Sequence, residues 1–217
     1  GVLHLIAAYI NDNYEIVGGV FNASHKDSLK FAKHIDIPTN RIYKDLDILV
    51  QSELKLPREE RMQVCSVLTP NFLHFPMAKK LLENGFHVIC EKPMTTNYEE
   101  ASILQKTLAK AQKVFAVTHT YTGYPMVRQM REMIKAGELG KIQKVDAQYY
   151  QGWINGVIHD QKKRSSVWRL DPKKAGISSC MGDIGVHAFN MIEFTTGLQV
   201  KSLLCDFNYL YDDNEMD

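Results

Sequence analysis

The sequence predicts an α/β fold: a doubly wound parallel domain, incomplete at its start, followed by the beginning of a second α/β domain with an open, largely antiparallel sheet. Up to about residue 120, short apolar runs alternate with single helical patterns, which is typical of βαβ units joined by right-handed crossovers. Beyond residue 121, apolar and polar residues alternate more strictly, as in a sheet with one exposed face. The apolar run 87–90 ends abruptly in Glu91-Lys92-Pro93, and charge at a strand end indicates a ligand site.

The first 120 residues supply the elements of the parallel domain in order. Their patterns predict helices at 2–10, 26–34, 45–54, 76–84 and 97–112, and strands at 14–21, 63–68, 87–90 and 114–118. Asn97 and Glu100 are spaced like a capping box. The phosphate-binding pattern G-x-G-x-x-G does not occur, and only Gly1 could be its last glycine. We therefore expect the first strand to be missing.

Residues 121–217 are expected to begin a second domain, after a first domain at 1–120. The patterns predict helices at 125–136 and 181–195 and strands at 142–150 and 200–209. The irregular segment 151–178, which contains both tryptophans, is more typical of a functional loop than of a simple connection. Because the chain ends on one strand of an unfinished sheet, we expect it to be a fragment.

Composition and charge exclude several classes of protein. The chain is 45% hydrophobic and 24% charged, as in ordinary globular domains, and its net charge of +1 argues against a nucleic-acid partner. No apolar run approaches the length of a membrane span and no signal peptide opens the chain, so we expect no membrane partner and a cytoplasmic location. The cysteines lack C-x-x-C spacing and are expected to be buried free thiols rather than metal ligands: Cys65, Cys90, Cys180 and Cys205.

Two groups of residues could carry chemistry. Asp183 and His187 are four apart on a predicted helix and therefore share a face. Histidine could remove a proton from an alcohol while the carboxylate orients it, but Asp183 could equally cap the helix and His187 could be a core histidine. Lys92 could stabilise a developing alkoxide or could simply reach solvent. The turn Thr69-Pro70-Asn71 could be only a turn or could contact a cofactor.

Five motifs resemble the Gfo/Idh/MocA oxidoreductases, which include glucose-fructose oxidoreductase and inositol dehydrogenases. The resemblance covers nearly the whole chain and depends on the order of the motifs: Thr69-Pro70-Asn71 with His74, Glu91-Lys92-Pro93, Thr118-His119-Thr120-Tyr121, Trp168-Arg169-Leu170-Asp171-Pro172 and Gly182-Asp183-Ile184-Gly185-Val186-His187. It implies a nicotinamide-dependent sugar or polyol dehydrogenase with an N-terminal Rossmann domain. It also implies a homo-oligomer, a dimer or tetramer, formed through the C-terminal sheet.

The resemblance also implies a role for each matching residue. Lys92, Asp183 and His187 would be catalytic, and no metal is implied. The cofactor, NAD or NADP, would lie along Gly1, Asn22, Ser24, Thr69, Pro70, Asn71, His74, Glu91 and Lys92. The substrate would lie near Tyr121, Trp168, Arg169 and Asp183.

The residues after Phe21 bear on the choice of cofactor. The sequence there is Asn22-Ala23-Ser24-His25-Lys26, without the acid that usually holds the ribose hydroxyls of NAD, so NADP is permitted. Two other functions remain open: an enzyme of the same fold that uses NAD transiently to cleave glycosidic bonds, and a non-catalytic NAD(P)-binding regulator.

Overall fold

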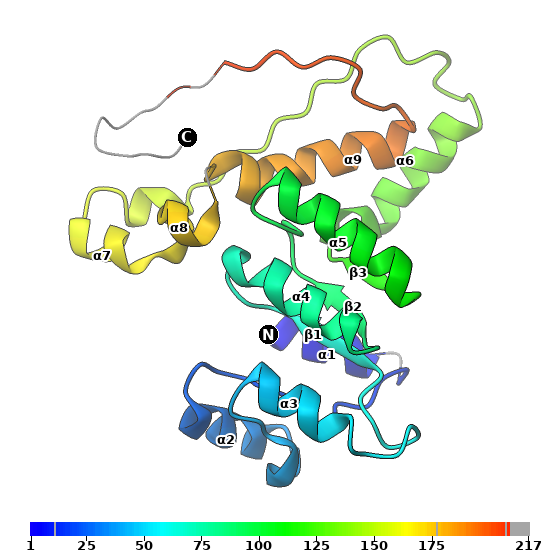
Figure 1. The fold of residues 1–217 in the computed structure, drawn as a ribbon. Coiled ribbons are helices and arrows are strands. Elements are labelled where there is room, and N and C mark those ends of the chain that lie inside the picture. The colour runs from blue at the N-terminus through cyan, green and yellow to red at the C-terminus, as the bar shows by residue number, and fades with distance from the viewer. Residues whose placement is uncertain (11, 177, 207, 209–217) are drawn as a thin grey trace.

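The fold is built on three parallel strands. The computed structural model describes residues 1–10, 12–176, 178–206 and 208. Its sheet has the order β1 (Val64–Val67), β2 (His87–Cys90), β3 (Phe115–Val117), with Cys65 opposite Val88 and Ile89 opposite Ala116. The parallel α/β architecture predicted from the sequence is confirmed (Figure 1).

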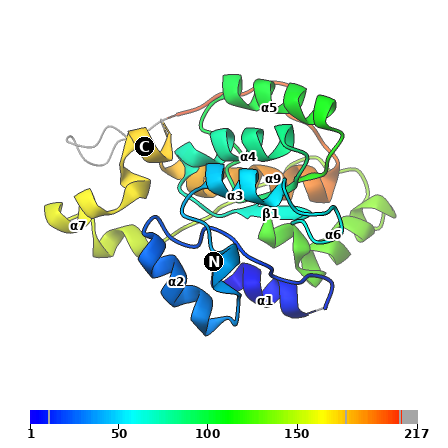
Figure 2. The same cartoon turned by 60° about the horizontal axis from the view of Figure 1, so that its bottom comes forward.

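Helices cover both faces of this sheet. Helix α4 (His74–Glu83) connects β1 to β2, and α5 (Tyr98–Ala111) connects β2 to β3. Because both right-handed crossovers step in the same direction, both helices lie on one face, where they pack together. Helices α1 (Val2–Ile10) and α2 (His25–His34) lie on the other side of β1 (Figure 2).

The main core lies between the sheet, α4 and α3 (Leu46–Glu53). Its most completely buried apolar side chains are Ala78, Leu81, Leu82, Phe86, Val88, Cys90 and Leu104. Burial of each large side chain stabilises the fold by about 1.5–3 kcal/mol. Cys65 and Cys90 are buried thiols as predicted, and desolvation raises the pKa of each to about 12. The prediction of burial is wrong for Cys180 and Cys205, which are exposed.

Side-chain caps fix where these helices begin. Ser24 caps α2, and Asp45 caps α3 by accepting the Ile48 amide at 2.8 Å. At α5, Asn97 accepts the Glu100 amide at 2.9 Å, which is one half of the predicted capping box. Glu100 completes the cap on a different residue, because its carboxylate accepts the Thr96 amide at 3.0 Å.

Three predicted strands are wrong within the described residues. In segment 14–21 only Gly19 pairs, through a single parallel bridge to Ile42, where Gly18 also passes so close to Arg41 that a Cβ would meet its carbonyl. Segments 142–150 and 200–206 form no ladder, although both are extended (Figure 1). Alternating patterns require a hydrogen-bonded neighbour to become a sheet, and none of the described residues supplies one. Residues 207 and 209 of the last predicted strand lie outside the described residues.

Short helices organise the rest of the chain. They are the 3-10 turns η1 (Thr39–Arg41), η2 (Asn71–Leu73), η3 (Thr120–Gly123), η4 (Trp153–Gly156) and η5 (Trp168–Leu170), the helices α6 (Pro125–Lys135), α7 (Gln161–Ser166), α8 (Pro172–Ala175) and α9 (Val186–Thr196), and the π-helical turn η6 (Met181–Gly185). Helices α6 and α9 pack together, with the Arg131 guanidinium 4.4 Å from the centre of the Phe194 ring. Among the described residues, every helix is too short or too polar to cross a bilayer.

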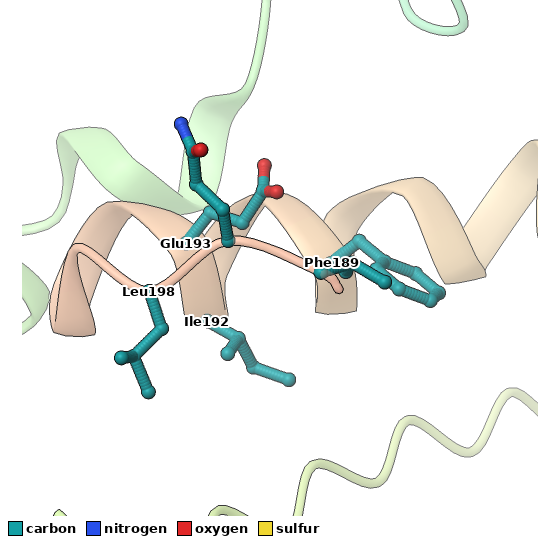
Figure 3. A pocket seen from close by; sticks show the side chains of 6 residues that line it. Phe189, Ile192, Glu193 and Leu198 are labelled. Atoms are coloured by element: carbon teal, nitrogen blue, oxygen red, sulfur yellow. The ribbon is translucent and has the colours of Figure 1, made fainter. Parts of the chain in front are cut away.

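A small hollow lies between α9 and the segment that follows it. Its volume is about 140 Å³ and its walls are largely apolar, with Phe189, Ile192 and Leu198 among them (Figure 3). It contains none of the residues predicted to act in chemistry, so the functional site must lie elsewhere.

Candidate active site

The carboxyl ends of the strands carry the polar residues of the site. Thr69 follows β1, Glu91 and Lys92 follow β2, and Thr118 and His119 follow β3. In parallel sheets these ends lie at one edge, where ligands bind in open α/β proteins. The parallel pairing therefore brings together motifs that are far apart in the sequence.

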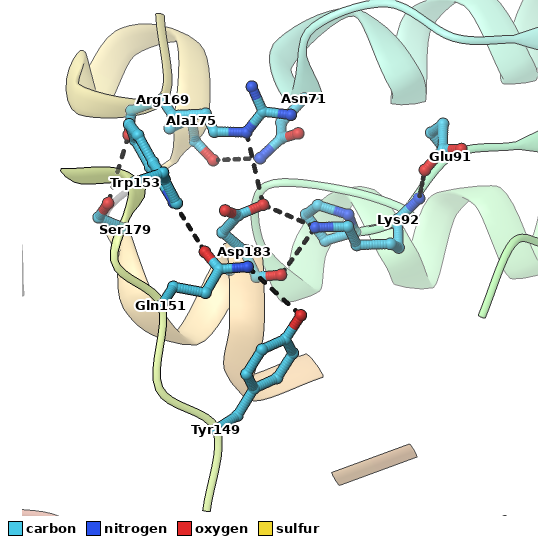
Figure 4. Close-up of polar contacts among 12 residues, drawn as sticks. Asn71, Glu91, Lys92, Tyr149, Gln151, Trp153, Arg169, Ala175, Ser179 and Asp183 are labelled. Atoms are coloured by element: carbon cyan, nitrogen blue, oxygen red, sulfur yellow. Dashed lines mark hydrogen bonds and ion pairs between the residues drawn. The ribbon is translucent and has the colours of Figure 1, made fainter. Parts of the chain in front are cut away.

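Lys92 joins this edge to the C-terminal part of the chain. Its ammonium donates to the Asp183 carboxylate at 2.7 Å and to the Asp183 backbone carbonyl, also at 2.7 Å (Figure 4). Both side chains are largely buried, with exposed fractions of 15% and 20%. The Arg169 Nε lies 3.5 Å from the same carboxylate oxygen. One aspartate oxygen thus faces two cations, and the structure brings together three residues that the sequence placed in the site.

A π-helical turn positions Asp183 and His187. Asp183 lies within η6, and His187 lies in the first turn of α9. Such wide turns are uncommon and often mark functional sites. Gly185 fits the turn because a Cβ there would lie 2.4 Å from the Met181 sulfur. Asp183 does not act as a helix cap, because neither η6 nor α9 has a side-chain hydrogen bond at its start.

His187 is held in its neutral form. Burial lowers its pKa, and the positive charge of Lys92 lowers it further, whereas Asp183 and Glu91 oppose this shift more weakly. The neighbouring His119, whose ring centre is 6.1 Å away, also has its pKa lowered by burial and by Lys92. A neutral imidazole has a free lone pair, so His187 can accept a proton.

These residues line a polar cavity of about 340 Å³. Lys92, Tyr121, Arg169, Asp183 and His187 were predicted from the sequence, and the structure places all five in its wall. Three further residues line it: Tyr149, which sequence reasoning missed, and Gln151 and Trp153, which lie in the predicted functional loop 151–178 but were not proposed as site residues. Their spacing of two was a usable signal, because alternate residues of an extended chain point to the same side.

Glu91 faces a partner that the sequence did not reveal. Its carboxylate is 2.7 Å from Nε2 of His4 on α1, and it also accepts the Lys92 amide at 3.3 Å. Burial raises the pKa of Glu91, but hydrogen bonds from His4 and Thr118 outweigh it and lower the pKa to about 2. Glu91 is therefore an anion that fixes the backbone of Lys92.

Asn71 and His74 are buried and occupied by protein partners. The Asn71 amide donates to the Ala175 carbonyl at 2.9 Å. The ring nitrogens of His74 lie 2.7 Å from the carbonyl oxygens of Thr69 and Pro93, so this side chain ties the ends of β1 and β2 together. Their predicted contact with a cofactor stays a prediction.

The other predicted site residues lie around the cavity or apart from it. Thr69 Oγ1 lies 3.8 Å from the Met77 sulfur, and Pro70 immediately precedes η2. The Trp168 ring stacks on the Arg169 guanidinium, 4.4 Å from its centre, and does not line the cavity.

The remaining three positions lie at helix starts. Gly1 accepts the His4 amide as α1 begins, and Ser24 caps α2. Asn22 accepts the Ser24 amide at 3.0 Å. Among the described residues, His, Cys, Asp and Glu side chains do not gather in threes as a metal site would require.

The fold and the site together define a class. A parallel α/β sheet covered by helices, with polar groups at the carboxyl ends of its strands, is the architecture of dinucleotide-binding proteins. The site adds a lysine, a carboxylate and a neutral histidine around one cavity.

Comparison with known proteins names the family. Residues 2–119 match the oxidoreductase family with an NAD-binding Rossmann fold, and residues 127–217 match the Gfo/Idh/MocA C-terminal domain. The chain therefore belongs to the Gfo/Idh/MocA oxidoreductase family, and its cofactor class is NAD or NADP.

Individual relatives agree with this assignment. The chain is 32% identical over 209 residues to the uncharacterized oxidoreductase YfiI of Bacillus subtilis, which covers 95% of this chain and 52% of the relative. An inositol dehydrogenase homolog from Azotobacter vinelandii, solved with NAD⁺, is 33% identical with a TM-score of 0.84 over 90% of this chain and 50% of its own. A structure of such a homolog from the same organism with NADH and myo-inositol gives 31% identity and a TM-score of 0.80, over 90% of this chain and 48% of that chain. The chain spans about half the length of these relatives.

Proposed function

We propose that the protein carrying this chain oxidises a secondary hydroxyl of a sugar or polyol, using NAD or NADP. The contact between Lys92 and Asp183, in one cavity with neutral His187, is the observation that carries this proposal. The homolog solved with NADH and myo-inositol supports a polyol or sugar as the substrate class.

His187 would act as the general base. As the substrate O–H bond breaks, its proton passes to the free imidazole nitrogen of His187. The carbon that bears this hydroxyl loses hydride from its C–H bond as the carbonyl forms. When bound, NAD or NADP supplies the hydride acceptor at nicotinamide C4. The products are then a ketone or lactone, the reduced cofactor and a protonated His187.

Lys92 would stabilise the substrate oxygen, and Asp183 would orient the substrate. The Lys92 ammonium stabilises the substrate oxygen as it gains alkoxide character, since a charge-assisted donor acts strongly in a partly water-excluded site. Asp183 accepts a hydrogen bond from a neighbouring substrate hydroxyl and holds Lys92 in place. Their 2.7 Å contact, within one cavity, supports both roles.

The edge of the sheet at the carboxyl ends of the strands has groups that suit a nicotinamide cofactor. Nδ1 of His119, at the end of β3, is buried without a hydrogen-bond partner among the described residues, and an amide group is a suitable partner for it. Residues 22–25, just before and at the start of α2, offer Asn22 and Ser24 and no acidic side chain, and Asp27 in the first turn is paired with Lys30; this supports NADP as a permitted cofactor alongside NAD. The homo-oligomer remains part of the proposal, based on the family.

The test is a spectrophotometric screen of the whole protein at 340 nm against myo-inositol, D-glucose, D-xylose, levoglucosan and glucose 6-phosphate, with each cofactor. We expect reduced cofactor to accumulate with at least one compound, and His187→Ala to abolish it. Turnover of a glycoside without net reduced cofactor would instead identify a glycosidase-type enzyme. Cofactor binding without turnover of any compound would contradict the dehydrogenase proposal.

A further inference from the structure

The backbone of Lys92 lies just beyond the end of strand β2. The last strand residue is Cys90, and the Glu91 amide still donates across the sheet to the Val67 carbonyl at 3.0 Å. The Lys92 amide instead donates to a side chain, the Glu91 carboxylate, at 3.3 Å (Figure 4). The position of the Lys92 backbone therefore depends on where the Glu91 carboxylate points.

The Glu91 carboxylate points toward helix α1. Nε2 of His4, in the first turn of α1, lies 2.7 Å from one oxygen of Glu91, and the other oxygen accepts the Lys92 amide. The side chains of His4 and Glu91 are mostly buried, with exposed fractions of 23% and 33%. One carboxylate thus connects α1 with the backbone of Lys92, using one oxygen for each.

The donor in the bond between His4 and Glu91 is the histidine. A carboxyl group is a stronger acid than an imidazolium ion by about 2 pKa units, so a proton between the two resides on the ring nitrogen. Although burial raises the pKa of Glu91, hydrogen bonds from His4 and Thr118 lower it to about 2. Another side chain that supplies an N–H at this place can therefore replace the histidine, whereas a ring without nitrogen cannot.

The Lys92 ammonium requires an accurate position. It makes two hydrogen bonds to Asp183, at 2.7 Å to the carboxylate and at 2.7 Å to the backbone carbonyl. A shift of about 1 Å would stretch both beyond the length of a hydrogen bond. A misplacement of this size can cost about 100-fold in rate.

We propose that His4 is a positioning residue: it holds the Glu91 carboxylate in the orientation that accepts the Lys92 amide, and so sets where the Lys92 ammonium meets Asp183 and the substrate oxygen. This inference rests on the proposed function and deepens it. None of the described residues of α1 lines the cavity, so His4 acts through Glu91 and Lys92. Its loss should therefore change kcat, which depends on the charge that develops in the transition state, more than KM.

Two substitutions separate the N–H donor from the shape of the ring. His4→Phe keeps a ring and removes the N–H, whereas His4→Gln removes the ring and keeps an N–H donor. With the compound turned over in the screen, we expect kcat of the whole protein to fall about tenfold in His4→Phe, with KM changed less than about twofold, and to stay within about threefold of wild type in His4→Gln. A merely structural role, in which the ring packs α1 onto the sheet, predicts the reverse order, and that order would overturn the inference.

His34→Phe is the matched control. Nδ1 of His34, on α2, also lies 2.7 Å from its partner, the Lys30 carbonyl, but this contact is exposed and lies outside the cavity. Its loss should leave kcat unchanged. In a Glu91→Ala background, which removes the connection between α1 and Lys92, His4→Phe should lower kcat no further. An undiminished loss in that background would show that His4 acts by another route and would contradict the proposal.

A measurement without substrate or cofactor separates this inference from the proposed function. Crystal structures of the whole protein, as wild type and as His4→Phe, show directly where Glu91 and Lys92 lie. We expect the Glu91 carboxylate of the variant to turn away from the Lys92 amide, and the Lys92 ammonium to lose at least one of its two bonds to Asp183. If phenylalanine prevents folding, His4→Ala, which also lacks the donor, takes its place. Wild-type positions of both side chains in the variant would refute the proposal, whatever the screen finds.

Discussion

Replacement of Lys92 by methionine tests the central contact of the site. Methionine keeps the length and most of the apolar volume of the side chain but removes the ammonium that bonds Asp183 twice at 2.7 Å. Among the described residues, the cationic neighbour that Asp183 then retains is Arg169, at 3.5 Å. The change therefore removes the donor proposed for the substrate oxygen and loosens the carboxylate proposed to orient the substrate.

The size of the effect follows from these contacts. Loss of one donor to a developing oxyanion costs about 100- to 1,000-fold in kcat, so kcat of the whole protein should fall by at least that factor. The positive charge of Lys92 also lowers the pKa of His187. Its removal should raise that pKa, and the acidic limb of the pH profile, which reports the neutral base, should move to higher pH.

Two control variants and the pH profile of kcat test this prediction. Lys92→Arg keeps the charge and should leave the acidic limb near its wild-type position while still lowering kcat, because a planar guanidinium does not reproduce the ammonium geometry. Lys79→Met, in an exposed pair with Glu83, should change neither quantity. Wild-type turnover in Lys92→Met, or an unmoved acidic limb, would refute the reasoning.

Two further predictions concern stability and pH. Glu53 is fully buried and accepts from Arg41 and from the Tyr43 hydroxyl and Met62 amide at 2.6 and 2.8 Å. Glu53→Gln leaves the largely buried Arg41 guanidinium without its carboxylate partner and should lower the free energy of unfolding by about 3 kcal/mol in urea titrations. The matched change in an exposed pair, Glu83→Gln, should lower it by under about 1 kcal/mol. In the folded protein the pKa of His187 is lowered by burial, and the pKa of Glu91 is lowered to about 2. The unfolded chain therefore binds more protons than the native chain, and the free energy of unfolding should fall as the pH falls below about 6.5. A urea midpoint that is constant between pH 7.5 and 4 would contradict this.

The parallel fold could be predicted because its signals are local. Apolar runs such as 87–90, punctuated by capping residues such as Asn97, determine where strands and helices begin, and the crossovers then have one hand. The failures share one cause. Segments 14–21, 142–150 and 200–206 carry strand-like patterns, but a strand also needs a neighbour, and the local sequence does not say whether one is present.

The residues of the site also divide into those that the sequence predicts and those that it does not. Lys92, Asp183 and His187 were predicted because their short motifs resemble those of a known family; spacing alone left the helix-cap, core-histidine and solvent alternatives open. Tyr149 and Gln151 carry no motif and enter the site only because an extended segment crosses the cavity. Their relevance depends on a tertiary contact, which spacing alone does not determine.

The bonds that assemble the site are also those that join the two parts of the chain. Lys92 bonds Asp183 across 91 positions, and Asn71 bonds the Ala175 carbonyl across 104. Because both donors follow neighbouring parallel strands, a shift of the C-terminal part relative to the sheet would break both bonds together. The cavity is lined from both sides of this junction, by Lys92 after β2 and by Asp183 and His187 in the C-terminal part. A substrate that contacts both Lys92 and Asp183 without separating them should therefore stabilise the junction itself, by RT ln(1 + [L]/Kd) for a ligand that binds only while both bonds are made.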